Sequence, residues 1–214
     1  MNKKEIQKNI SKYSSYMREI RRRTDVAMKI VSLRKAGNSL TGDDETDIDL
    51  MYLQLRKVSE LIMFACVVAR KTAGDNLNRV LRKGYEIGKL RKELENLNLN
   101  YFPVPKYDKG TSAEGIRSVG DLQGTDSRYA SATDLLSTYG RASNYLHAQR
   151  EDKYGNDNAK IRLLDRATEE FNSIIALLNH HWIQVTEDTF FAVVMRGIED
   201  GEVQVSLMER VDDT

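Results

Sequence analysis

The chain has 214 residues, of which 40% are apolar and 30% are charged, and its formal net charge at pH 7 is +1. This length can bury one sizeable core, and the composition is typical of a soluble, helix-rich protein rather than a disordered or collagen-like one. The small net charge hides an asymmetry. Residues 1–36 hold eleven Lys/Arg against three Asp/Glu, whereas residues 187–214 hold two Arg against eight Asp/Glu.

The first predicted element is a basic helix over residues 3–36, which Gly37 ends. Its apolar residues recur at three- and four-residue steps: Ile6, Ile10, Tyr13, Met17, Ile20, Thr24, Ala27 and Val31. Two interpretations are open for the polar cluster Arg21, Arg22 and Arg23. The arginines form a solvated helix face, or they contact phosphates, because such clusters give sequence-independent affinity for nucleic acid.

A second helix is predicted from about residue 46 to 73, capped by Thr46 or Asp47 and central to the bundle because its middle is apolar nearly all round. Its longest apolar run, residues 61–69, is too short to span a bilayer. The run contains the only cysteine, Cys66, which we expect to be a buried thiol in a reducing cytosol. The first residues lack an apolar leader, so we expect a cytoplasmic protein.

Three more helices are predicted from capping residues and apolar spacing, over residues 75–96, 131–149 and 158–180. Ser131 or Thr133 is the expected cap of the middle one. Residues 97–130 are irregular and contain prolines and sparse glycines. We expect them to be a long connection that packs on the bundle.

The last part of the chain changes to β-prone runs at residues 190–195 and 203–208, joined across Asp200-Gly201. Asp-Gly between such runs is a strong hairpin signal, and residues 182–185 are a candidate third strand. The predicted fold is therefore mainly α, a helical bundle with a C-terminal antiparallel β-hairpin. A lone hairpin is marginal in water, so it must pack on the bundle or pair with another chain.

This pattern predicts a helical bundle over residues 1–180 and a β-hairpin appendage over residues 181–214. His180 and His181 are expected at a helix C-terminus, where a cationic imidazole is favoured. A metal site with a neighbouring acidic residue is the alternative. No CxxC pair, HExxH sequence or Walker loop occurs, so no cofactor or metal is expected.

The candidate catalytic residues are Arg141, Asn144 and His147, which an unbroken helix would carry on one polar face. At about 100° per residue, Arg141 and His147 lie roughly 120° apart, with Asn144 between them. Ser143 precedes His147 by four residues and can approach its ring, and Arg150 extends the face. Arginine, asparagine and histidine can hold a phosphate and move a proton near neutral pH. A structural polar face and a metal site are the alternatives.

Here the sequence resembles the HEPN superfamily, helical bundles whose ribonuclease members carry an arginine, about four to six residues and then a histidine. Arg141 and His147 have five residues between them. The segment Asp49–Ile62, with Glu60 among apolar residues, is similar to the long early helix of such domains. The resemblance covers about residues 46–180.

The resemblance implies a metal-independent endoribonuclease acting on RNA, of a kind that often serves as a toxin or defence effector. In it His147 takes the proton from a ribose 2′-hydroxyl, Arg141 stabilises the phosphorane charge and Asn144 orients the phosphate or the histidine. Arg150, like the arginines of the first helix, is a candidate RNA contact.

Family members commonly dimerise across this helix, so we expect a homodimer or a stable complex with another protein. The alternative is a non-catalytic interaction module of the same fold, which binds a partner protein or nucleic acid and in which His147 is structural. Ala142 favours this alternative, because the family usually places a polar residue directly after the arginine.

Overall fold

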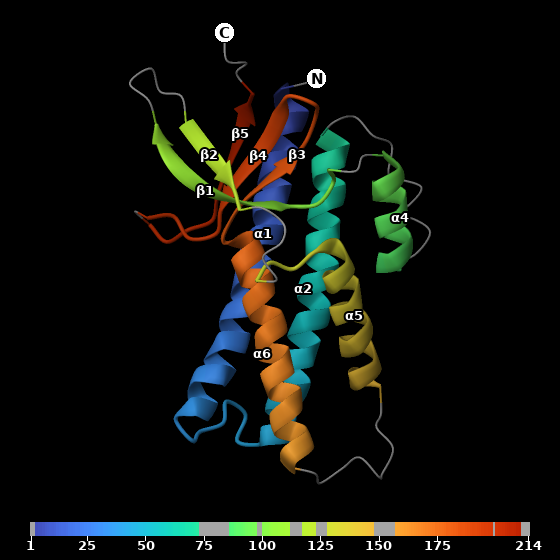
Figure 1. The fold of residues 1–214 in the computed structure, drawn as a ribbon, viewed down its shortest axis with the longest axis vertical. Helices are drawn as coiled ribbons and strands as arrows, with labels where there is room; N and C mark the ends of the chain where they lie inside the picture. Colours follow the sequence, from blue (N-terminus) through green and yellow to red (C-terminus); the bar gives the residue numbers. More distant parts are fainter. Residues whose placement is uncertain are drawn as a thin grey trace.

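The structure is a computed structural model that describes residues 3–72, 86–97, 100–111, 117–122, 128–147, 157–198 and 200–210. The described chain is mainly helical, as predicted, and carries more β-structure than a hairpin. Figure 1 shows a bundle of long helices with a curled antiparallel sheet at the end where the two chain termini lie.

The bundle is organised around α2 (Asp44–Thr72), which runs antiparallel to α1 (Lys3–Lys35) (Figure 1). The helix α6 (Asp157–Asn179) packs against both of them. The shorter helices α5 (Ala132–Leu146) and α4 (Ile87–Leu97) also pack on α2. α2 therefore forms the centre of the bundle, as its apolar pattern predicted.

The middle of α2 is buried on several sides. Ile62, Met63 and Cys66 are fully buried, and burial raises the pKa of the Cys66 thiol, so this cysteine is inert at neutral pH. The apolar stripe of α1 also faces the core, through Tyr13, Met17, Ile20, Ala27 and Ile30. Among the described residues, no helix has the length and apolarity that a membrane span requires.

The sheet has five antiparallel strands in the order β2-β1-β3-β4-β5. The predicted hairpin is present as β4 and β5, and the candidate third strand is present as β3, beside β4. Gly201, with a φ of 66°, supplies the left-handed turn residue before β5. The strand bounds are Val104–Thr111 (β1), Arg117–Asp121 (β2), His180–Gln184 (β3), Thr189–Val194 (β4) and Gln204–Glu209 (β5).

The expectation of a connection without regular structure over residues 97–130 was wrong, because β1 and β2 lie within it. β1 pairs with β3, more than 70 residues further along the chain, so long-range backbone hydrogen bonds stabilise a segment with no alternating apolar pattern. The Tyr107 ring lies across the neighbouring strand at Gly120, where any side chain would collide with it. The sheet thus combines β1 and β2, which precede residue 180, with the three strands that begin at or after it.

His180 and His181 directly follow the C-terminus of α6, as expected, but they begin β3, and His181 is fully buried against the bundle. Its Nδ1 donates to the Leu178 carbonyl oxygen at 2.8 Å, and its Nε2 accepts a hydrogen bond from the Tyr13 hydroxyl at 3.0 Å. Burial lowers the pKa of His181 to about 4. The imidazole is therefore neutral at pH 7 and links α1, α6 and the sheet.

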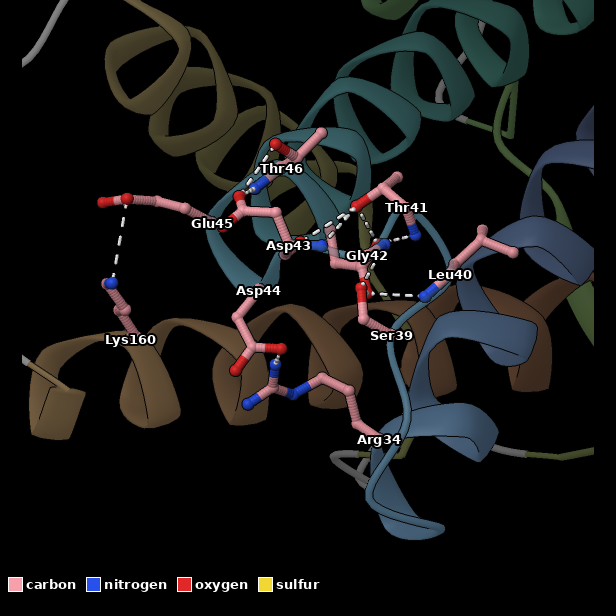
Figure 2. Close-up of polar contacts among 11 residues, drawn as sticks. Arg34, Ser39, Leu40, Thr41, Gly42, Asp43, Asp44, Glu45, Thr46 and Lys160 are labelled. Carbon is pink, nitrogen blue, oxygen red and sulfur yellow. Dashed lines mark hydrogen bonds and ion pairs between the residues drawn. The ribbon is translucent and has the colours of Figure 1, made fainter.

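The turn between α1 and α2 is held by a buried carboxylate, Asp47. α2 begins at Asp44, capped by Asp43, whose Oδ1 accepts the Thr46 backbone N–H at 2.8 Å (Figure 2). Asp47 is not the cap. It is fully buried and accepts hydrogen bonds from the Ser39 hydroxyl, the Leu40 and Thr41 N–H groups and the Thr41 hydroxyl. Burial by itself would raise the pKa of Asp47, but the hydrogen bonds from these donors have the larger combined effect, so the pKa of Asp47 is lowered.

Candidate functional site

The candidate catalytic residues lie at the C-terminal end of α5, which begins at Ser131 with a capping box and ends at Leu146. Arg141 is half-buried, whereas Asn144 and His147 are exposed. His147 is the C-cap, with φ −72° and ψ 143°, so its backbone is extended and has left the helix. The helical angle between Arg141 and His147 therefore does not apply, although Arg141 and Asn144 remain neighbours on the helix.

Arg141 bridges α5 to α6. Its Nε donates to Glu170 Oε1 at 2.7 Å, its Nη2 pairs with the same oxygen, and Nη2 also donates to Thr138 Oγ1 at 3.2 Å. Arg166 approaches Glu170 Oε1 at 3.6 Å from the preceding turn of α6. The Glu170 side chain is only 11% exposed, and its buried Oε2 has no hydrogen-bond partner in the part of the chain that the structure describes. Two guanidinium groups thus share the Glu170 carboxylate. Hydrogen bonds and then the charge of Arg141 lower the pKa of Asp134, which lies earlier on α5.

Two tyrosines, Tyr52 in α2 and Tyr145 in α5, lie near the ion pairs of Glu170. The rings of Tyr52 and Tyr145 stack, with centroids 4.1 Å apart and an angle of 27° between their planes. The Tyr52 hydroxyl donates to the Leu163 carbonyl oxygen at 3.2 Å. Burial and then the charge of Glu170 raise the pKa of Tyr52 to about 12, so it remains a neutral phenol. Because Tyr145 belongs to α5 and Tyr52 to α2, the stacked rings join the C-terminal half of α5 to α2.

Ser143 was expected beside the imidazole of His147. Its hydroxyl is buried and has no hydrogen-bond partner among the described residues. Arg150, the predicted RNA contact, lies outside the described residues.

The arginine cluster of α1 is spread over three environments. Arg21 is 19% exposed, and it donates to the Gly201 carbonyl oxygen and pairs with Glu202 at 3.3 Å, which ties α1 to the turn before β5. Arg23 donates to Gln54 Oε1 of α2 at 2.8 Å. Only Arg22 is largely exposed, at 76%, and it pairs with a glutamate of its own helix. α1 and α5 lie on either side of α2 in Figure 1.

Sequence reasoning missed the partners that other helices bring to Arg141. The pair Arg166 and Glu170, four residues apart in α6, could have been found as a helical ion pair. That Glu170 faces Arg141 depends on how α5 and α6 lie on α2, and no local pattern encodes it. Among the described residues, no group of three His, Cys, Asp or Glu side chains gathers as a metal site would require.

Comparison of the chain with protein-family models, with curated proteins and with solved structures finds no match. Any functional conclusion therefore rests on the residues and their geometry.

Proposed function

We propose that this protein is a metal-independent endoribonuclease, similar to the HEPN ribonucleases, whose reacting groups lie at the end of α5. The observation that supports the proposal is the arrangement at the end of α5, where the half-buried Arg141 and the exposed Asn144 lie in the last turns and the exposed His147 follows as the C-cap. Arg141 shares the Glu170 carboxylate with Arg166, so Glu170 alone does not neutralise both guanidinium groups. A guanidinium group and an accessible imidazole suit a phosphate with a neighbouring hydroxyl.

In the proposed reaction the imidazole of His147 takes the proton of a ribose 2′-hydroxyl. The 2′-oxygen attacks the adjacent phosphorus, and the bond to the 5′-oxygen breaks. The 5′-oxygen takes a proton from the imidazolium, so the products are a 2′,3′-cyclic phosphate and a 5′-hydroxyl. Arg141 stabilises the charge that grows on the phosphorane oxygens, and Asn144 donates a hydrogen bond to the phosphate. A second copy, docked across α5, would enclose the RNA in a shared cleft.

The test is cleavage of a labelled single-stranded RNA in excess EDTA. The wild type is expected to leave cyclic-phosphate ends, and His147→Ala and Arg141→Ala are expected to abolish cleavage. Arg162→Ala is the matched control, because Arg162 is an exposed arginine of α6. Since His147 is exposed, its substitution should leave the melting temperature nearly unchanged. Equal cleavage by the wild type and His147→Ala would remove the enzyme hypothesis.

The Arg141–Glu170 pair favours a second candidate, a non-catalytic interaction module of the same fold. In that case Arg141 is a strut between α5 and α6, and the exposed residues around it bind a partner protein or nucleic acid. Arg141→Ala and Glu170→Ala would then lower the melting temperature by similar amounts, and the double variant would lose little more than either single variant. No variant or wild-type protein would cut RNA.

A further inference from the structure

The sheet has one face against the bundle and one face turned away from it. On the inner face, Tyr13 of α1 meets Phe191 edge-on, with ring centroids 5.3 Å apart. Side chains alternate along a strand, so the residues next to the buried ones point the other way. The strand register places one set of them together, which we call the outer face: Val104, Lys106, Trp182, Phe190, Met208 and Arg210.

Two aromatic rings occupy the middle of the outer face. Trp182 and Phe190, on neighbouring strands, have ring centroids 5.6 Å apart and are both half-buried. The indole Nε1–H of Trp182 is covered and has no hydrogen-bond partner among the described residues. A buried donor without an acceptor costs free energy, which a carbonyl group of a ligand would recover.

Two cations lie over these rings. Lys106 Nζ is 5.6 Å from the centroid of the Trp182 ring, and Arg210 Cζ is 5.6 Å from that of Phe190. Burial and then the charge of Arg210 lower the pKa of Lys106, so two like charges are held near each other. The exposed Glu187 and Asp188 lie at one end of this face, in the turn between β3 and β4. An anionic ligand with flat groups would match both the charges and the rings.

We propose that the outer face binds single-stranded nucleic acid, with bases stacked on Trp182 and Phe190 and phosphates contacted by Lys106 and Arg210. Single strands are bound in this way elsewhere, because every base has a flat apolar face and every linkage carries one negative charge. In the unliganded protein the two cations cover the rings. On binding they move to the phosphates, and bases take their place. This inference concerns binding at the sheet and does not depend on cleavage at α5.

The chain offers a direct probe, because Trp182 is its only tryptophan. We expect the dodecamer dT12 to quench the Trp182 fluorescence and to bind in the micromolar range. DNA lacks the 2′-hydroxyl, so this measurement is unaffected if the ribonuclease proposal fails. An abasic dodecamer of equal charge is expected to bind at least tenfold more weakly and to quench little. Equal affinity for the abasic strand, or for a twelve-residue polyglutamate, would overturn the proposal, since the face would then be only an anion or acidic-peptide site.

Variants separate stacking from charge, with binding followed by the anisotropy of labelled dT12. Phe190→Leu removes the aromatic face and is expected to weaken binding about tenfold. The double variant Lys106→Gln/Arg210→Gln should reduce the slope of log K against log salt by about 1.4, or roughly 0.7 per lost contact. Lys29→Gln, at an exposed position of α1, and Tyr107→Leu, off the outer face, are the controls.

U12 is run beside dT12 to show whether RNA is preferred. Unchanged affinity in both the leucine and the double variant, with wild-type melting temperatures, would refute the assignment.

Discussion

The buried His181 makes the stability of this protein depend on pH in a predictable direction. Its two ring nitrogens are both used in the neutral form, one as a donor to Leu178 and one as the acceptor for Tyr13. Protonation would put a second hydrogen on Nε2, facing the Tyr13 hydroxyl, and would leave a cation in the core. The folded state therefore resists protonation, whereas the unfolded state does not.

The magnitude follows from the two pKa values. The folded pKa is about 4 and the ordinary value is 6.5. Because the folded pKa is the lower one, the stabilisation is fully present above pH 6.5 and is lost as the pH falls from there toward 4. With about 1.4 kcal/mol per pKa unit, the loss between pH 7 and pH 5 is about 2 kcal/mol. Above pH 5, carboxylates with lowered pKa values such as Asp47 remain ionised, so they add little in this window.

The assay is urea unfolding followed by helical circular dichroism at pH 7, 6 and 5. His181→Gln is the matched variant, because an amide can accept from Tyr13 and donate to Leu178 but cannot titrate. Its stability should change with pH about 2 kcal/mol less than that of the wild type between pH 7 and pH 5. If His181→Gln is too unstable, Tyr13→Phe keeps the histidine and should keep the pH dependence. Equal pH slopes for the wild type and His181→Gln would refute the reasoning.

Further predictions concern the helices and the assembly of the chain. Asp47→Asn should lower the free energy of unfolding by about 2–4 kcal/mol in the same urea assay. Both carboxylate oxygens of Asp47 accept hydrogen bonds, whereas an amide has a single acceptor oxygen, so some of the donors in the turn would lose their acceptor. Arg21→Gln should lower the melting temperature because it breaks the contacts with Gly201 and Glu202, whereas Arg22→Gln should not. If α1 also contacts RNA, Arg21→Gln and Arg22→Gln should each reduce the slope of log K against log salt for RNA binding. An unchanged slope for Arg22→Gln would mean that the arginine cluster is only a structural and solvated helix face. Light scattering at micromolar concentration should give a dimer or larger mass, and a clean monomer would remove the shared-cleft mechanism.

The hairpin finds its packing partners within one chain, because β4 is flanked by β3 and β5 and packs on the bundle. The expectation of a dimer across α5 now rests on the resemblance of Arg141 and His147 to the HEPN motif alone.

The helix that carries Arg141 and Asn144 was predicted correctly along the chain, but the geometry around these residues was not. The sequence placed Arg141, Asn144 and His147 on one continuous helix, and the Ser131 cap was among the predicted ones. The helix ends at Leu146, and no capping residue in the sequence predicted that end. Glu170 then pairs with Arg141, so the charge available to a phosphate depends on a residue 29 positions away.

By itself the sequence determined the long helices, the central place of α2, the buried Cys66 and the terminal hairpin. Each of these depends on side-chain spacing or turn residues within a few positions, and such local preferences act whatever the rest of the chain does. Only the tertiary structure decided that β1 and β2 join the sheet, that His181 is a neutral core residue and that Asp47 closes a turn rather than caps a helix. Those outcomes depend on hydrogen bonds and burial between segments far apart in the chain. Their free energy exists only once the bundle and sheet have come together.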